Sequence, residues 1–252
     1  MASGQELIAH QETLYASHNP TRRWLHCSRR DFILGCVNKY GPKRGGAAME
    51  VGPGSGVYLP ALASRFDKVV ALDIEASYLE NAKELTRAYP NIETVTCNIT
   101  NCTLEPERFD LILCSEVVEH LSDSRAALRE MHRLLQPGGV LVLSTPQRYS
   151  TLEIVAKIAF LPGIVHGVRW VYREPVLEMG HINLMTEAEV REQLEEAGFT
   201  VLEHHKSGLY LPLIAEFFGA RALCAAQWLE KKIRGVALSW MLWTQYYVAG
   251  RK

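Results

Sequence analysis

Three alternating glycines follow an apolar run and an acid early in the chain. Residues 49–56 read Met-Glu-Val-Gly-Pro-Gly-Ser-Gly, with the glycines at Gly52, Gly54 and Gly56. Glycine adopts positive φ and has no Cβ, so this spacing suits a tight strand-to-helix turn that a ligand approaches closely. A turn of this kind, after the first strand of an open α/β sheet, holds nucleotide-like ligands. The run therefore predicts a site for a dinucleotide or for S-adenosylmethionine (SAM).

The residues next to the glycines distinguish between these two ligands. A dinucleotide fingerprint has its third glycine at the sixth position, where this chain has Val57. The carboxylate of Glu50 would repel a pyrophosphate, whereas it would attract the amino group of SAM. SAM also carries a sulfonium charge and only one carboxylate. We therefore expect SAM, and a nicotinamide-dependent oxidoreductase is the alternative.

Polar residues stand at the ends of the next two predicted strands. Residues 68–73 read as a buried strand that ends in Asp73, whose carboxylate can accept both hydroxyls of a ribose. Capping of the following helix is the alternative role for this acid. Strand 92–97 ends at Asn98 and Ile99, where the amide oxygen of the first and the backbone of the second can contact an adenine ring.

The later part of this region continues the alternation of strands and helices. Strand 110–114 leads to Ser115 at the carboxyl edge of the sheet, the edge at which ligands of open α/β sheets bind. A helix with apolar positions between 126 and 135 follows. Residues 136–139 read Gln-Pro-Gly-Gly, which predicts a helix stop and a turn before a fifth strand at 140–145.

This series of motifs resembles that of the class I, Rossmann-like SAM-dependent methyltransferases. Over residues 47–146 it comprises Glu-Val-Gly-Pro-Gly-Ser-Gly, Phe-Asp-Leu-Ile, Glu-His-Leu, Leu-Leu-x-Pro-Gly-Gly and Leu-Ser-Thr-Pro. The resemblance implies an α/β fold with a seven-stranded, mostly parallel sheet, helices on both faces and an antiparallel last strand at 244–251. It implies that SAM is held by residues of the glycine turn and the strand ends, namely Glu50, Gly52, Gly54, Gly56, Asp73, Ile74, Asn98, Ile99 and Ser115.

The segments outside the SAM-binding core are expected to select the methyl acceptor. We expect a single domain over residues 1–252, in which residues 1–46 form an amino-terminal helical cap. This cap is predicted to be helical from about residue 5 to 40, with a break at Asn19-Pro20. A lid insertion follows the fifth strand, and the remaining residues complete the sheet and its helices; these parts span 147–185 and 186–252. Candidate acceptor contacts in the cap are Tyr15, His18 and Trp24, for which core packing is the alternative.

Methyl transfer needs aligned reactants and a group that takes the proton of the acceptor. His120 and His181 are the two candidate bases, because histidine titrates near neutral pH. A structural hydrogen-bonding role is the alternative for each. Neither an Asn-Pro-Pro-Tyr motif after the fourth strand nor a Pro-Cys nucleophile is present. The sequence therefore favours an oxygen acceptor on a small molecule, and a nitrogen or carbon acceptor is the alternative.

Two acids and one of these histidines also form a candidate metal site. Glu116, Glu119 and His120 stand at i, i+3 and i+4, a spacing that can turn them the same way on one helical turn. The ubiquinone-pathway O-methyltransferases, which this chain resembles in Ser-Glu-Val-Val-Glu-His and in an apolar insertion after the fifth strand, carry a similar set. The resemblance implies a divalent ion such as magnesium and a lipophilic acceptor. A site without metal is the alternative.

The composition restricts the partners of the protein. The formal net charge of the chain is -1 at pH 7, which argues against a nucleic-acid substrate. The one dense basic stretch, Arg22 to Arg30, reads as the solvated face of an amphipathic helix. Six cysteines without a Cys-x-x-Cys pair and no secretory signal predict reduced thiols in the cytoplasm.

Three apolar stretches that contain isolated cations lie outside these motifs. They lie at 154–162, 168–172 and 209–233. Such stretches suit a substrate lid or a helix at a membrane interface, and ordinary packing onto the core is the alternative. A third class of protein is a noncatalytic nucleotide-binding module that meets a partner through the last of these stretches.

Overall fold

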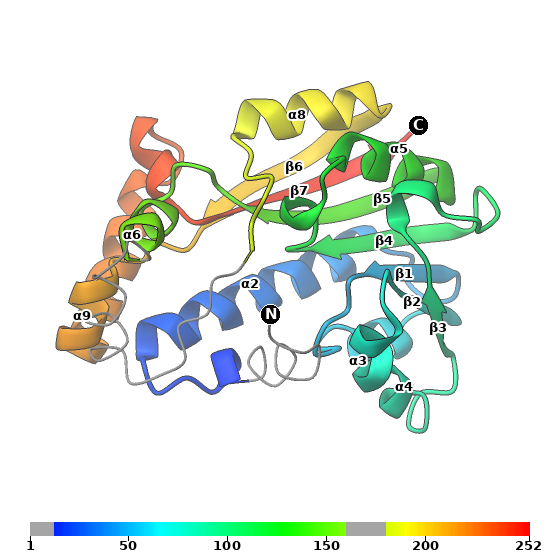
Figure 1. Cartoon of the computed structure of the whole chain (residues 1–252), viewed down its shortest axis with the longest axis horizontal. Helices are drawn as coiled ribbons and strands as arrows, with labels where there is room; N and C mark the ends of the chain where they lie inside the picture. The colour runs from blue at the N-terminus through cyan, green and yellow to red at the C-terminus, as the bar shows by residue number, and fades with distance from the viewer. Residues whose placement is uncertain (1–12, 160–179) are drawn as a thin grey trace.

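A seven-stranded sheet forms the centre of the molecule (Figure 1). The computed structural model describes residues 13–159 and 180–252. The strand order is β3-β2-β1-β4-β5-β7-β6, and only β7 runs antiparallel to its two neighbours. The predicted fold class and the antiparallel last strand are confirmed. The strands are β1 Ala47–Val51, β2 Lys68–Asp73, β3 Ile92–Thr96, β4 Phe109–Ser115, β5 Leu135–Pro146, β6 Phe199–Ser207 and β7 Thr244–Arg251.

Helices cover both faces of the sheet, as Figure 1 shows. One apolar cluster joins α2, α3 and α4 to the sheet, and a second joins α5 and α8 to its other face. This arrangement explains why the central strands read as continuous apolar runs, because both of their faces are buried. The helices are α2 Pro20–Tyr40, α3 Leu59–Ala63, α4 Glu80–Leu85, α5 Ser124–Leu134, α6 Thr151–Ala159, α8 Glu187–Glu196 and α9 Pro212–Ile233, and the 3-10 turns are η1 Ala76–Leu79, η2 Ile99–Asn101, η3 Val118–His120 and η4 Ala237–Met241.

The chain reverses its direction of travel across the sheet between β1 and β4. It runs outward from β1 through β2 to β3, and then returns to pair β4 with the free edge of β1. The crevice outside the carboxyl ends at such a switch point is where open α/β sheets bind ligands. Val51 and Cys114 are partners at this point. The fold therefore brings the glycine turn beside the loop that follows β4.

The amino-terminal cap consists largely of one long helix. The side chain of Asn19 accepts hydrogen bonds from the amides of Thr21 (3.0 Å) and Arg22 (3.1 Å), and Pro20 is the first helical residue. Both features favour a helix start, so the break predicted at Asn19-Pro20 is confirmed. Residues 1–12 of the predicted cap lie outside the described residues.

Two boundaries in the second half show where local signals succeeded and failed. Thr186 and Glu189 form a reciprocal capping box at the start of α8, as the run Thr-Glu-Ala-Glu indicates. In contrast, β5 begins at Leu135, so residues 136–139 extend the strand instead of forming a separate turn. A register shift in the pairing of β4 with β5 accommodates them.

The predicted lid is described in part. It begins with helix α6, while residues 160–179 lie outside the described residues. The apolar stretch at 168–172 therefore receives no structural account. Within the described ranges, no helix has the length and apolar character needed to cross a bilayer.

Candidate active site

The glycine turn adopts the backbone conformation that its sequence predicts. Gly52, Gly54 and Gly56 have φ values of 67°, 51° and 73°, a region that other residues rarely enter. A Cβ atom at Gly52 would lie 2.6 Å from Cγ2 of Val117. Glycine is therefore required there both for its conformation and for the close approach of the turn to the loop after β4.

Glu50 lies below this turn as a buried and incompletely paired acid. Its residue is 2% exposed, and its Oε2 atom has no hydrogen-bond partner. Burial raises the pKa of this carboxyl to about 8, because the low-dielectric surroundings disfavour the charged form. An unpaired carboxylate at a ligand-binding turn fits a cationic group such as the amino group of SAM.

Asp73 stands at the carboxyl end of β2, as predicted. Its Oδ1 accepts a hydrogen bond from the amide of Glu75 (3.2 Å), and burial is the main cause that raises its pKa. The cap position of the following 3-10 turn is Glu75, so Asp73 supports the turn and does not cap it. The neighbouring Ile74 is 59% exposed, which leaves an apolar surface beside the carboxylate.

The side chain of Asn98, the predicted adenine contact, forms local hydrogen bonds just after β3. Its Oδ1 accepts hydrogen bonds from the amide (3.0 Å) and the hydroxyl (2.9 Å) of Thr100, and Asn98 is thereby the cap of η2. Both lone pairs of the amide oxygen are in use, so an adenine amino group would have to displace one of these donors. Ile99 is buried in the core cluster beneath.

The loop after β4 is joined to the amino-terminal helix by a buried ion pair. Glu116 has a left-handed φ of 57°, and its carboxylate accepts hydrogen bonds from the guanidinium of Arg29 and from the hydroxyl of Ser144 (2.9 Å). The Ser144 hydroxyl also lies 3.0 Å from that of Ser115. Arg29 is therefore part of the site. The sequence analysis had read the basic stretch around it as a solvated helix face, and the structure corrects this for Arg29, which is buried.

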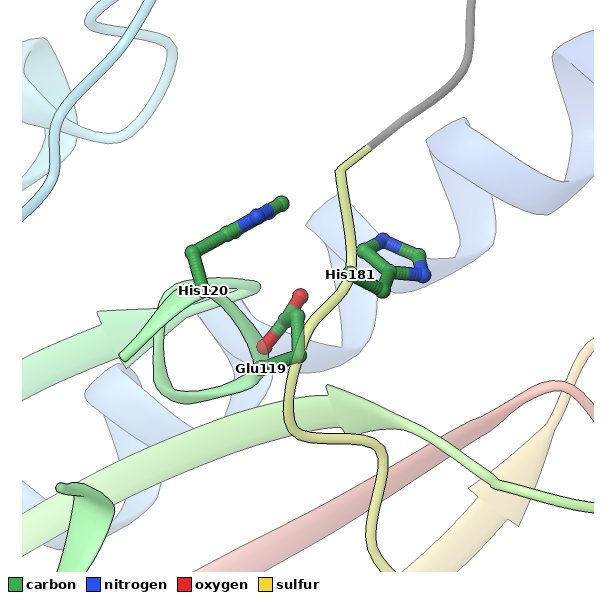
Figure 2. Close-up of side chains that lie close together, drawn as sticks. All are labelled: Glu119, His120 and His181. Atoms are coloured by element: carbon green, nitrogen blue, oxygen red, sulfur yellow. The ribbon is translucent and has the colours of Figure 1, made fainter. Parts of the chain in front are cut away.

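Glu119, His120 and His181 converge beside this loop (Figure 2). The ring centroids of the two histidines are 5.2 Å apart. Nδ1 of His120 lies 3.3 Å from the carbonyl oxygen of Gly180, which assigns the proton to Nδ1 and leaves a lone pair on Nε2. The pKa of His120 is lowered by burial first and by His181 second, so its neutral form is favoured.

Glu119 occupies the deepest position of the three. It is fully buried, its Oε2 accepts a hydrogen bond from the hydroxyl of Thr145 (3.1 Å), and its Oε1 lacks a partner. The pKa of its carboxyl is raised well above the usual range, mainly because the group is buried. Its backbone carbonyl accepts the amides of Ile182 (3.0 Å) and Asn183 (2.9 Å), which holds the segment carrying His181 against the loop after β4.

The cluster that could hold a divalent ion therefore differs from the predicted set. Ligand atoms of Glu119, His120 and His181 lie within 4.8 Å of one another. Glu116, the third predicted ligand, is paired with Arg29 instead. The physical reason is the left-handed backbone at Glu116, which breaks the helical turn that the i, i+3, i+4 spacing presupposed.

Glu153 is a site residue that the sequence did not reveal. It lies on α6, is 5% exposed, and places Oε1 3.4 Å from Nδ1 of His181. The indole nitrogen of Trp243 donates a hydrogen bond to the same oxygen (3.2 Å). A carboxylate against one imidazole nitrogen orients the ring. The only sequence signal for Glu153 is its position as a lone acid in an apolar helix.

A hollow of about 300 Å³ opens beside His181. It is lined by the segment that carries this histidine and by two cationic side chains from the start of the lid, namely by Arg148, Lys157, His181, Ile182, Asn183 and Leu184. His181, the second candidate base, therefore lines a hollow next to the carboxyl edge of the sheet. The cap residues Tyr15 and His26 lie nearby in an edge-to-face contact with centroids 6.0 Å apart.

The fold and the glycine-turn site together define a Rossmann-like methyltransferase. A family model described as a methyltransferase domain matches residues 22–204. The chain therefore belongs to the SAM-dependent methyltransferase family.

Individual relatives agree with this assignment. A probable S-adenosylmethionine-dependent methyltransferase of Mycolicibacterium smegmatis is 29% identical over 200 residues, which cover 75% of this chain and 69% of that protein. A ubiquinone biosynthesis O-methyltransferase of Haemophilus ducreyi is 34% identical over 112 residues, which cover 41% of this chain and 47% of the relative. The chain thus spans about half the length of that ubiquinone-pathway relative.

A solved structure reproduces the whole architecture. The N-methyltransferase NodS from Bradyrhizobium japonicum, in complex with S-adenosyl-L-homocysteine, has a TM-score of 0.62 and 18% sequence identity. The superposition covers 98% of this chain and 96% of NodS. At this level of identity the likeness establishes the fold alone.

Proposed function

We propose that the protein methylates an oxygen of a small lipophilic or aromatic metabolite. The observation that carries this proposal is the Glu153 and His181 pair beside the hollow, since it provides an oriented imidazole where an acceptor hydroxyl can enter. The relatives named as ubiquinone biosynthesis O-methyltransferases support an oxygen acceptor. When bound, SAM supplies an electrophilic methyl group.

The residues around the glycine turn fit SAM group by group. The buried carboxylate of Glu50 attracts the amino group, and the guanidinium of Arg29 is a buried cation for the single carboxylate of the ligand. Asp73 accepts the ribose hydroxyls. Ile74 and Ile99 provide an apolar contact and a backbone contact for adenine. Ser115, at the end of β4, is a further proposed contact to SAM.

His181 is the proposed general base. Because its Nδ1 faces Glu153, its Nε2 is the nitrogen that can take the proton of an acceptor hydroxyl. The carboxylate of Glu153 holds the ring in that orientation. His120 is held neutral by burial and can orient the acceptor through Nε2.

A divalent ion would be held by Glu119, His120 and His181. The orphaned Oε1 of buried Glu119 fits a cation, and a bound ion would lower the pKa of an acceptor hydroxyl. Two imidazole nitrogens and one carboxylate suit zinc better than magnesium, which prefers oxygen ligands. This donor set modifies the magnesium expectation drawn from the sequence.

The first test is calorimetric titration of the purified protein with SAM and separately with NADH, each with added magnesium or manganese and with chelator. We expect micromolar SAM binding and no NADH binding. A screen of lipophilic phenols for formation of S-adenosylhomocysteine then tests the acceptor class. Turnover that survives chelator supports His181 as base, whereas turnover abolished by chelator supports the metal. SAM binding without turnover of any hydroxyl acceptor would favour a noncatalytic module.

Replacing Asp73 with alanine is expected to weaken SAM binding by about 1.5–3 kcal/mol, roughly 10- to 150-fold, because two charge-assisted hydrogen bonds are lost. The variant Asp67→Ala is a matched control, since this acid is exposed at the other end of the same strand. Calorimetry measures both. Unchanged affinity in Asp73→Ala would refute the ribose assignment.

A further inference from the structure

Helix α9 is amphipathic in an unusual sense, because its small residues face inward and its large apolar residues face outward. The helix is kinked at Gly219, where φ is 48° and ψ is -120°. After the kink, the buried positions Ala222, Ala226 and Ile233 recur at intervals of four and seven residues, which defines one face of a helix. Before the kink, Ala215 is buried, and three of these four buried residues are alanine.

The outward side of α9 exposes several of the largest apolar side chains of the protein. Phe217 is 71% exposed, Phe218 62% and Trp228 64%, and Ile214 is 47% exposed. Exposed apolar side chains that occur singly need no explanation, but a contiguous set on one element marks a contact surface. We call these four residues the α9 apolar face.

The charges around the α9 apolar face are all of one sign among the described side chains of the helix. Arg221, Lys231 and Lys232 are exposed. The two acids of the helix are turned away: Glu216 pairs with an arginine of α2 at 3.0 Å, and Glu230 is buried and accepts two backbone amides of the loop after β6. The sequence contains no Asp or Glu after Glu230.

Helix α6 extends this surface toward the active site. Ile154 and Ile158 are 40% and 51% exposed, and Lys157 between them is exposed as well. Leu152 of α6 and Ala215 of α9 belong to one apolar cluster. Figure 1 shows the two helices at the same end of the molecule.

We propose that the α9 apolar face binds an anionic lipid surface, with the helix lying in the interface. Aromatic and aliphatic side chains flanked by lysine and arginine are the composition of helices that lie in the headgroup region. A second copy of the chain fits the face less well. A twofold interface places a patch against itself, so the basic residues Arg221, Lys231 and Lys232 would be brought toward the same basic patch of the partner, with no exposed acid of the described helix to pair with them.

The proposed docking gives the site a route to its acceptor. Glu153, which orients His181, lies on α6 between Leu152 and Ile154. Binding through α9 and α6 therefore brings the hollow beside His181 near the lipid. This consequence rests on the proposed function, whereas lipid binding itself requires neither SAM nor acceptor, so the two fail independently.

Cosedimentation with vesicles tests the proposal. We expect the full chain to bind phosphatidylcholine vesicles that contain phosphatidylglycerol, and to bind pure phosphatidylcholine at least tenfold more weakly. Added salt should weaken the binding because it screens the charges. The variants Phe217→Ser with Phe218→Ser, and Lys231→Glu with Lys232→Glu, should each lower the partition coefficient at least tenfold, since one basic residue near an anionic surface contributes roughly fivefold.

Matched controls separate this effect from general changes of charge or hydrophobicity. Lys43→Glu with Arg44→Glu makes the same change of net charge in an exposed linker, and Leu202→Ser removes an exposed apolar side chain from β6. Both controls should bind vesicles as the unaltered protein does, and all variants should bind SAM unchanged. Vesicle binding that is absent, or equal in all variants, overturns the proposal. So does a dimer in sedimentation equilibrium that Phe217→Ser with Phe218→Ser converts to a monomer, because a second copy would then cover the face.

Discussion

Replacing His181 with alanine is expected to lower kcat by about 100- to 10,000-fold, the usual contribution of a positioned general base. The affinity for SAM should not change, because His181 lies on the acceptor side of the site and away from the glycine turn. The measurement is the rate of S-adenosylhomocysteine formation with a lipophilic phenol acceptor, together with calorimetry of SAM binding. The corresponding change at His132, which packs edge-on against Phe199 on another face of the sheet, should leave kcat unaltered.

The partner of His181 gives this prediction a second readout. Glu153→Gln keeps the shape of the side chain but removes the negative charge 3.4 Å from Nδ1 of His181. The imidazole loses the carboxylate that orients its ring, so kcat should fall while the affinity for SAM stays unchanged. Equal losses of kcat and of SAM affinity would indicate a merely structural Glu153. Full turnover in His181→Ala together with a loss in His120→Ala would transfer the role of base to His120.

Replacing Glu50 with glutamine is expected to weaken SAM binding by about 1.5–3 kcal/mol, because a charge-assisted contact to the amino group of SAM becomes a neutral one. The same change should stabilise the protein without ligand at alkaline pH. Since the folded pKa of Glu50 is raised to about 8, its contribution to stability is fully present below the unfolded pKa and is lost as pH rises toward 8. Glutamine has no charge to bury, so the Tm of the variant relative to the unaltered protein should rise between the unfolded pKa and about pH 8 and stay constant above it.

The raised pKa of Glu50 also predicts a pH dependence of SAM binding. Below about pH 8 the carboxyl is protonated in the free protein, and the cationic ligand favours its ionised form. Binding should therefore release about one proton at neutral pH, and affinity should rise by up to tenfold per pH unit until about pH 8. Calorimetry in buffers of different ionisation enthalpy measures the released proton. Equal proton release in Glu50→Gln would assign it to another group.

The glycine-turn half of the candidate site was predictable because its determinants are local. The glycine spacing reports backbone conformation directly, and Asp73 ends a strand whose apolar run is unmistakable. The edge at which these residues meet follows from parallel pairing alone. The adenine contact of Asn98 stays a prediction. In the structure its side chain caps its own 3-10 turn, because a short amide side chain readily satisfies nearby backbone donors.

The half of the candidate site around His120 and His181 was predictable only in its residue types. The sequence singled out both histidines, and the structure brings them together, but it did not indicate Glu153, since the contact of Glu153 with His181 joins residues that nothing in the sequence pattern relates. Arg29 was read as solvated because it stands among other arginines. Its burial depends on Glu116, a residue 87 positions away in a left-handed conformation that no sequence rule for glutamate predicts.

Two backbone amides donate hydrogen bonds to the carbonyl oxygen of Glu119, and this link affects how the choice of methyl acceptor can change. They attach the main chain at residues 182 and 183 to the main chain at residue 119, and any amino acid there offers the same carbonyl. The side chains on the two segments can therefore be replaced one at a time while the backbone hydrogen bonds keep the segments at the same spacing. Replacement of these side chains alone can change which acceptor is methylated, and the glycine turn stays unchanged.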